Sequence, residues 1–198
     1  MLAYMQFVVA VLLALLSTQI GTAQRIRFNT YSLSQGLSQS TVNAIVQDRQ
    51  GFIWLGTQDG LNRFDGYGFK VYRHNPSSAS SLSDNFVQSL LEDNTGRIWV
   101  GTYNGGISIY DPVADQFQNV PLRNGSVKPG VMSMVDDGIV VWAATTGGLF
   151  TIDKKSLQVK LYSTADASRL PSNQVRQILK WRKGDLWVAC APGGVVKW

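Results

Sequence analysis

The fold of this chain is decided by the stretch Asp48-Arg49-Gln50-Gly51-Phe52-Ile53-Trp54-Leu55-Gly56-Thr57-Gln58-Asp59-Gly60-Leu61. It has the pattern of a turn, a short apolar strand, a second turn and the start of another strand. The block returns at Asp93–Thr102 and, in weaker form, at Asp137–Thr145 and Lys183–Cys190. Self-similarity at a period of about 40 to 50 residues is typical of propeller blades or helical arrays. The β-rich character of these copies favours blades.

Each copy predicts four short antiparallel strands, which is the make-up of one propeller blade. In the first copy we expect strands at Thr41–Gln47, Phe52–Gly56, Leu61–Phe64 and Phe69–Arg73, with the first strand innermost. The expected blades span residues 37–80, 81–125, 126–168 and 169–198, and the last reaches Trp198 inside its third strand. We therefore predict an all-β fold of about four blades that forms an incomplete ring.

Residues 24–36 are expected to form an N-terminal strand and a polar connection. Ile26–Tyr31 alternates apolar and polar side chains, as a half-buried strand does, and it resembles Phe69–Arg73. It is therefore interpreted as the last strand of a blade that precedes the first complete one. The alternative is that it supplies the outer strand that the fourth copy lacks, which would close a small four-bladed ring.

Tryptophan recurs at one position of every copy, as Trp54, Trp99, Trp142 and Trp187. Each small sheet has two faces, and stacking the sheets around an axis buries both. We therefore expect these indoles to fill the space between neighbouring blades, where truncating one costs roughly 3–5 kcal/mol. A stripe of tryptophans can also stack against sugars, but recurrence at the blade period favours packing.

The first 23 residues have the layout of a secretory signal peptide. The apolar run Phe7–Leu16 is followed by the small residues of Gly21-Thr22-Ala23, which predicts cleavage after Ala23. The segment before the run carries no Lys or Arg. The apolar run is shorter than the roughly 20 residues that span a membrane, which disfavours an anchor. Export to the periplasm is therefore predicted.

Composition and the scarcity of reactive side chains exclude several classes of function. Hydrophobic residues make up 44% of the chain and charged residues 16%, which disfavours disorder. The net charge of +5 is dispersed, so no nucleic-acid partner is expected. His74 and Cys190 are the single histidine and cysteine, and neither has neighbours in sequence that make a metal site or a nucleophile. We predict no catalytic residue, no metal and no cofactor.

The acidic residues recur at predicted turns rather than in pairs. Asp48 matches Asp93, and Asp65 matches Asp111 and Asp153. An aspartate at a repeated turn position is expected to accept hydrogen bonds from backbone N–H groups.

The polar residues that vary between copies are predicted to share one rim of the arc. In a propeller, the connection from an outer strand to the next inner strand lies on the same rim as the turn between the second and third strands. Polar groups around a depression suit a small hydroxylated ligand, an oligosaccharide or a peptide, and a plain hydrated rim is the alternative. The candidate ligand-binding residues are Asn43, Gln58, Asp59, Asn85, Tyr103, Asn104, Thr146, Asn173 and Gln174.

Two stretches, Leu37–Asp65 and Leu82–Asp111, closely resemble the two-component regulator propeller repeat. The resemblance implies the periplasmic sensor region of a bacterial receptor, either a hybrid histidine kinase or a diguanylate cyclase. It also implies a seven-bladed propeller, often two in tandem, followed by a small β-sandwich, a membrane helix and a cytoplasmic output module. The chain thus resembles an N-terminal fragment whose partner is the rest of an inner-membrane receptor.

Three functions are consistent with these observations. The first is a ligand-sensing propeller module, the second a secreted propeller enzyme that acts on polysaccharide, and the third a structural platform for protein interaction. The enzyme would need paired carboxylates near the axis. An open arc also exposes two blade faces and unpaired strand edges, so we expect the isolated chain to oligomerise, with a dimer as one form.

Overall fold

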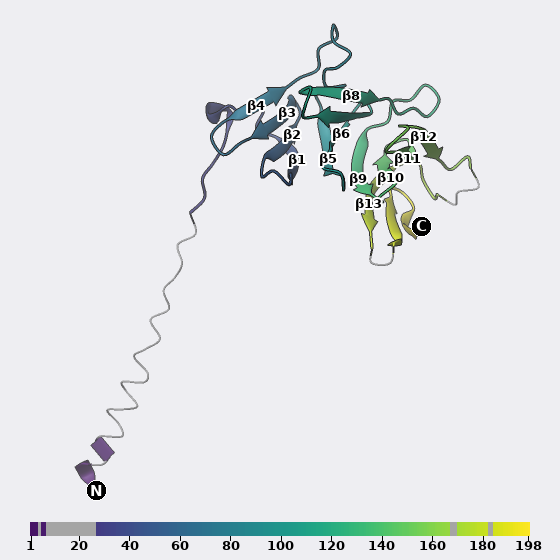
Figure 1. Ribbon diagram of the computed structural model, residues 1–198. Coiled ribbons are helices and arrows are strands. Elements are labelled where there is room, and N and C mark those ends of the chain that lie inside the picture. The colour runs from purple at the N-terminus through teal and green to yellow at the C-terminus, as the bar shows by residue number, and fades with distance from the viewer. Residues whose placement is uncertain (4, 7–26, 167–169, 182–183) are drawn as a thin grey trace. The chain divides into compact units, whose positions relative to one another are not determined.

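The computed structural model describes residues 1–3, 5–6, 27–166, 170–181 and 184–198 (Figure 1). It divides into two units, Met1–Thr30 and Tyr31–Trp198. Most of the predicted signal peptide lies outside the described residues. Within the described part of the chain, no helix is both long and apolar enough to cross a membrane.

The second unit is built from four antiparallel sheets, and the chain is all-β as predicted. A single short 3₁₀ helix, η1 (Leu33–Gln35), precedes them among the described residues. The first sheet contains β1 (Val42–Gln47), β2 (Ile53–Thr57), β3 (Gly60–Phe64) and β4 (Phe69–Tyr72); the second contains β5 (Val87–Glu92), β6 (Ile98–Thr102), β7 (Ile107–Asp111) and β8 (Gln116–Val120). The third contains β9 (Val131–Asp136), β10 (Val140–Thr145), β11 (Gly148–Asp153) and β12 (Val159–Tyr162); the fourth has three strands, β13 (Val175–Lys180), β14 (Leu186–Cys190) and β15 (Gly194–Lys197).

The turns explain why the repeated block folds in this way. At the turn between the first and second strands, Gly51 and Gly96 have φ angles of 95° and 89°, which glycine adopts without strain. Asp48 Oδ1 accepts hydrogen bonds from the backbone of Gln50 and Phe52 at 3.0 Å, so the predicted turn role of this aspartate is confirmed. The same bonding recurs at the other predicted turn aspartates, Asp65, Asp93, Asp111 and Asp153.

The sheets follow one another around an open arc with their first strands adjacent. Strand β1 contacts β5, β5 contacts β9, and β9 contacts β13 (Figure 1). The first strand of each sheet is therefore innermost, as predicted. Each of these inner strands has a register shift at its start, as between Val42 and Ala44 in β1. Because the bulge recurs in all four sheets, it belongs to the repeat rather than to one blade.

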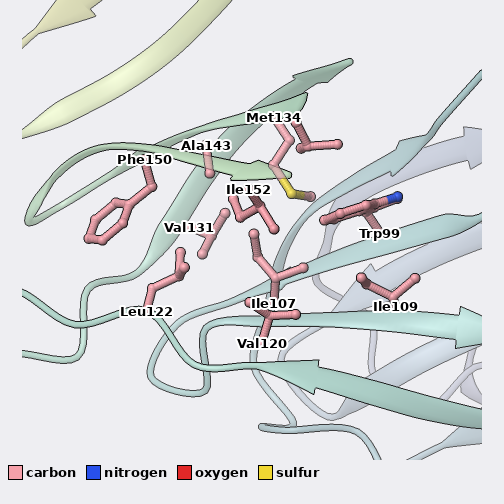
Figure 2. Packing of buried hydrophobic residues seen from close by; sticks show 11 residues of the cluster. Trp99, Ile107, Ile109, Val120, Leu122, Val131, Met134, Ala143, Phe150 and Ile152 are labelled. Carbon is pink, nitrogen blue, oxygen red and sulfur yellow. The ribbon is translucent and has the colours of Figure 1, made fainter. Parts of the chain in front are cut away.

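The hydrophobic core lies between successive sheets rather than inside any one of them. Figure 2 shows the cluster between the second and third sheets, where Trp99 and Ile107 face Val131 and Met134. Equivalent clusters lie between the first and second sheets and between the third and fourth.

Three of the four recurring tryptophans are sealed in these clusters and the fourth is not. Trp54, Trp99 and Trp142 are 1%, 0% and 8% exposed, respectively. Trp187 is 40% exposed, which corrects the expectation that all four fill gaps between blades. The reason is positional: each indole is covered by the sheet that follows, and none of the described residues forms a sheet after β15.

The strand expected at Ile26–Tyr31 is also wrong for the residues that the structure describes, 27–31. These residues form no strand, and the fourth sheet keeps three strands, so the alternative of a closed four-bladed ring within one chain fails too. A strand needs a ladder partner for its backbone groups, and no described strand pairs with this segment. Tyr31 packs instead against the first sheet, with its ring centroid 4.8 Å from that of Phe64.

Candidate functional site

One rim of the arc is formed by the turns between second and third strands together with the connections that lead into the inner strands. Backbone hydrogen bonds tie the two kinds of loop together, as predicted. They run from Gly60 N to Asn85 O (2.7 Å), from Tyr103 N to Phe86 O (2.9 Å), from Thr146 N to Gly130 O (3.0 Å) and from Ala191 N to Gln174 O (2.8 Å). This set of loops is called the upper rim below.

Several of the predicted rim residues use their side chains to hold the loops. Asn43 Nδ2 donates to Val87 O of the next sheet at 2.9 Å, and Asn85 Oδ1 accepts from His74 N at 2.7 Å. Thr146 Oγ1 accepts from Gly130 N at 2.9 Å. Asn173 Oδ1 and Gln174 Oε1 accept from Thr164 N and Arg176 Nη2, respectively. These contacts give the polar side chains a structural role at the rim.

Asp59, the acidic member of the predicted set, is engaged by a neighbouring cation. Arg73 Nη2 lies 2.9 Å from Asp59 Oδ2, and Arg73 Nε lies 3.2 Å from the same oxygen. The hydrogen bond to Asp59 raises the pKa of Arg73 above its ordinary value. The Asp59 carboxylate is therefore occupied by an ion pair with Arg73.

Tyr103 forms the most distinctive feature of the upper rim. Its ring stacks on Phe86 with centroids 5.2 Å apart and planes inclined by 24°. Tyr103 also packs against Gly130, the residue that precedes β9 of the third sheet. A Cβ built on Gly130 would lie 3.2 Å from Tyr103 O and 3.3 Å from Tyr103 Cδ2. Tyr103 remains 45% exposed. An aromatic face that is fixed from below and open to solvent can stack against a flat or ring-shaped ligand.

A hollow of about 180 Å³ includes Asn104, the residue that follows Tyr103 in the chain. Its lining residues are Ser83, Asn104, Gly105, Pro121, Leu122, Arg123 and Lys128. The Ser83 hydroxyl accepts from Ser108 Oγ at 2.8 Å, which fixes its position. The lining thus combines a hydroxyl, an amide and two cations, a set that suits a polar ligand with acceptor or acidic groups.

The structure thus brings Tyr103 and Asn104 to an exposed aromatic pair and a hollow, and it leaves Gln58 exposed away from that lining. Sequence reasoning missed Phe86, Ser83, Arg123 and Lys128. The signal for Phe86 was available, because it lies in the connection that leads into the second inner strand. Arg123 and Lys128 flank the small turn at Asn124↔Val127, a turn that the other copies do not share.

The opposite rim holds a second cavity, of about 160 Å³, between the first and second sheets. Here the Arg63 guanidinium lies 4.7 Å from the Phe52 ring centroid and donates to Tyr110 Oη at 3.2 Å. Tyr72 and Tyr110 each donate to Asp115 Oδ1 at 2.8 Å. The network joins β3 and β4 of the first sheet to β7 and the turn between β7 and β8 of the second.

The pKa values of two groups in this network are shifted away from neutral pH. Burial raises the pKa of Tyr72 far above its ordinary value, and its hydrogen bond to Tyr110 adds to the effect. A hydrogen bond from Lys70 lowers the pKa of Asp115 to about 2. Both shifts keep the groups in their ordinary charge states at neutral pH.

Neither of the two single reactive residues forms a reactive site. His74 Nδ1 lies 2.7 Å from Leu82 O, and because a carbonyl only accepts, this nitrogen donates and the ring ties down its own loop. Burial raises the pKa of the Cys190 thiol, which disfavours the thiolate. Across the described residues, no group of three or more His, Cys, Asp and Glu side chains is placed to hold a metal ion.

The model of the two-component regulator propeller repeat matches residues 36–59 and 81–104. The matched residues lie in the first two blades. Each match covers the connection into an inner strand, the first two strands and the turn that follows, so the matched segments include part of the upper rim.

Two of the similar proteins are a histidine kinase and a hybrid two-component system. A histidine kinase P4 of Formosa agariphila is 52% identical over 54 residues, which is 27% of this chain and 4% of that protein. The extracellular domain of a hybrid two-component system from B. thetaiotaomicron is 31% identical, with a TM-score of 0.70 over 82% of this chain. This chain covers only 21% of that domain, so it spans about a fifth of its length.

A further solved structure shows the fold alone. The computationally designed protein Ika4 is 15% identical, with a TM-score of 0.56, and the match covers 81% of this chain and 91% of the designed one. This chain shares its fold with part of the extracellular domain of a hybrid two-component system.

Proposed function

We propose that this chain is a periplasmic ligand-sensing propeller segment of a two-component receptor, with a membrane helix and an output module encoded outside these 198 residues. The observation that carries the proposal is the match of four-fifths of the chain to an extracellular receptor domain. The apolar run and small residues near the N-terminus support export. The chain itself has no catalytic role in this proposal.

The upper rim is the proposed contact surface for the ligand, with Tyr103 and Phe86 as its aromatic centre. A sugar ring stacks on an aromatic face, while its hydroxyl groups bond to amides and hydroxyls such as those of Asn104 and Ser83. The proposed ligand is therefore an oligosaccharide or another small hydroxylated molecule. The proposal assigns the other rim residues, including Gln58 and Asp59, to the edge of the contact.

The test is a thermal-shift and calorimetric titration of the purified chain with named probes. These are xylo-, manno- and gluco-oligosaccharides, with oligogalacturonides as acidic probes. A ligand that binds the native state raises its midpoint, by RT ln(1 + [L]/Kd) in free energy. The expected outcome is a shift for at least one probe that Tyr103→Ala abolishes.

Tyr67→Ala is the matched control, because Tyr67 is a 99% exposed tyrosine in the turn between β3 and β4, on the opposite rim. Equal loss of the shift in both variants would count against the upper rim as the contact surface. A folded sample that responds to none of the probes would count against direct sensing of sugars.

A further inference from the structure

The hollow at the upper rim differs in charge from the cavity on the opposite rim. Two cations, Arg123 and Lys128, line the upper hollow, and no acidic residue does. The cavity on the opposite rim is lined by two acidic residues and two arginines, so its charges balance. A cleft lined by one sign of charge attracts ligand groups of the opposite sign. The upper hollow therefore favours an anionic group.

A short turn places the two cations opposite each other. Asn124 and Val127 pair across this turn, and the backbone N–H of each donates to the carbonyl of the other at 3.1 Å. Residues 123 and 128 are the next opposite positions, and both line the same hollow. Like charges directly opposite each other across antiparallel backbone repel. An anion bound between Arg123 and Lys128 would relieve this repulsion.

No carboxylate of the described residues neutralises the pair. Neither Arg123 nor Lys128 forms an ion pair or a side-chain hydrogen bond within the described part of the chain. Asp84 follows a lining residue in the chain, but two backbone N–H groups engage its carboxylate. Asp84 Oδ1 accepts from Phe86 N at 3.3 Å, and Oδ2 accepts from Asn104 N at 2.9 Å.

The backbone that carries the two cations is fixed to the neighbouring sheets. Leu122 is 2% exposed and belongs to the core between the second and third sheets. Asn124 Nδ2 donates to Gly147 O, in the turn between β10 and β11, at 2.9 Å. Pro129 packs on the same glycine, where a Cβ would lie 2.9 Å from Pro129 Cβ. The site is thus preorganised in its backbone, which lowers the cost of binding.

The floor of the hollow adds uncharged hydrogen-bonding groups. Gly105 packs on Ser83, where a Cβ would lie 2.6 Å from the Ser83 hydroxyl oxygen. The Asn104 side-chain amide also lines the hollow and has no hydrogen-bond partner among the described residues. The volume of about 180 Å³ is below the roughly 300–1,000 Å³ of sites that enclose a whole drug-sized ligand. The hollow therefore suits one group of a larger ligand.

We propose that this hollow is an anion subsite of the upper rim, which takes the carboxylate or sulfate ester group of an acidic sugar between Arg123 and Lys128. The planar guanidinium matches two oxygens of such a group, and the ammonium adds a point charge. Asn104 follows Tyr103 in the chain and so connects the subsite to the aromatic face. The inference rests on the proposed function, because it names the acidic class of the same ligand.

The first experiment compares matched charged and neutral probes by calorimetric titration of the purified chain. Trigalacturonate is matched with its methyl ester, which has the same rings without the charge. The acid should bind roughly three- to tenfold more tightly at about 0.01 M salt. The advantage should shrink at about 0.1 M salt, where the Debye length falls from about 30 Å to about 10 Å. A sulfated galactan oligosaccharide and its desulfated form are the second pair, and the larger difference assigns the group as carboxylate or sulfate ester.

Variants locate the effect. Arg123→Gln and Lys128→Gln should each weaken the acidic probe by roughly threefold or more and leave the neutral one unchanged. Lys155→Gln is the matched control, because it removes the same charge from an exposed lysine between β11 and β12, on the opposite rim. It should leave both affinities unchanged. Equal binding of acid and ester together with equal binding of the sulfated pair, or equal losses in Arg123→Gln and Lys155→Gln, would overturn the inference and leave the oligosaccharide proposal standing.

Inorganic sulfate tests the subsite apart from the sugar. In NMR titrations against chloride at constant ionic strength, sulfate should shift the backbone amides of Asn104, Gly105 and residues 123–128. The Arg123→Gln/Lys128→Gln double variant should not show these shifts. Such a result supports the subsite even where no oligosaccharide binds, an outcome that counts against the proposed function alone. For a chain that binds none of the oligosaccharides, absence of the sulfate shifts, or the same shifts in the double variant, would overturn the inference as well.

Discussion

Trp99 and Trp187 occupy the same position of the repeat and have different surroundings. Trp99 is fully buried, and its Nε1 donates to Asp93 Oδ2 at 2.9 Å. Trp187 is 40% exposed, and Trp181 stands where the second sheet has Asp93. The backbone turn is nevertheless the same, since Gly96 N donates to Asp93 O and Gly184 N to Trp181 O. The repeat fixes where an indole lies, and the following sheet decides what the indole contributes.

The third sheet is intermediate between these two. Trp142 is buried, but its Nε1 is a buried atom without a hydrogen-bond partner among the described residues. Asp137 lies five residues before Trp142, whereas Asp93 lies six before Trp99. The residue six before Trp142 is Asp136, which pairs with Lys154 at 2.9 Å. Asp137 occupies the position of Asp93, but the turn after it is one residue shorter. The Asp137 carboxylate therefore makes no hydrogen bond to Trp142 Nε1.

The largest expected effect comes from truncating the buried indole. Trp99→Ala should lower the free energy of unfolding by about 3–5 kcal/mol, because it leaves a cavity between two sheets. Trp187→Ala should change it by about 1 kcal/mol or less, since the side chain is half exposed. Urea denaturation at concentrations where the chain is monomeric measures both. Equal losses would break the comparison.

Removing the carboxylate beneath the buried indole is expected to have the next largest effect. Asp93→Asn should destabilise the fold by up to about 3 kcal/mol, because buried donors lose a charged acceptor. Asp48→Asn is the comparison in the first sheet, where Asp48 Oδ2 accepts from Trp54 Nε1 at 2.7 Å. Urea midpoints at neutral pH report both changes, and an unchanged midpoint for Asp93→Asn would contradict the assignment.

The same variant predicts a pH dependence. Burial alone would raise the pKa of Asp93, but hydrogen bonds from Thr95, Trp99 and Arg97 outweigh it and hold the pKa well below its ordinary value. A depressed pKa in the folded state gives stability that is present above the unfolded value of about 3.9 and is lost as pH falls below it. The wild-type protein should therefore lose stability from about pH 4 downward, and Asp93→Asn should lose less over that range.

A smaller effect is expected at the glycine that receives the next sheet. Gly56→Ala should cost about 2 kcal/mol, because its Cβ would lie 2.5 Å from Val87 Cγ1 and the two sheets would have to separate. Ala189→Gly in the fourth sheet is the converse change, where no following sheet presses, and it should cost about 1 kcal/mol or less. Thermal unfolding ranks the two variants, and the opposite order would contradict the packing account.

The smallest expected effect is that of restoring the repeat's own residue in the fourth sheet. Trp181→Asp gives the turn a side-chain acceptor, as Asp48 has, and removes an exposed indole. The expected gain in unfolding free energy is about 0.5 kcal/mol. It is small because the Trp187 indole, which the new carboxylate would accept a hydrogen bond from, is half exposed to water. Urea denaturation against the wild-type chain measures it, and a loss of more than about 1 kcal/mol would show that Trp181 packs in a way that the repeat does not predict.

The blade architecture was predictable because it depends on local signals that recur. The Asp-Gly turns, the apolar strands and the period fixed the sheets to within a residue or two, and the recurring aspartates were correctly placed at turns. The carboxylate–indole bond was not predicted, because it depends on the three-dimensional closure of a six-residue loop. At the candidate site, the rim position of Tyr103 and Asn104 could be predicted from their loop, whereas Phe86 needed the stacking geometry and Arg123 needed the fold of the connection after β8.

The sequence by itself determined that this chain is a series of blades, because each repeat carries its own turns and strand pattern within about 45 residues. Only the tertiary structure decided which repeated side chains are buried. Burial is a property of the neighbour, and an indole is sealed only where another sheet follows it. For the same reason, the pattern of Ile26–Tyr31 was strand-like while its described residues form no strand, since backbone pairing needs a partner that the local sequence does not supply.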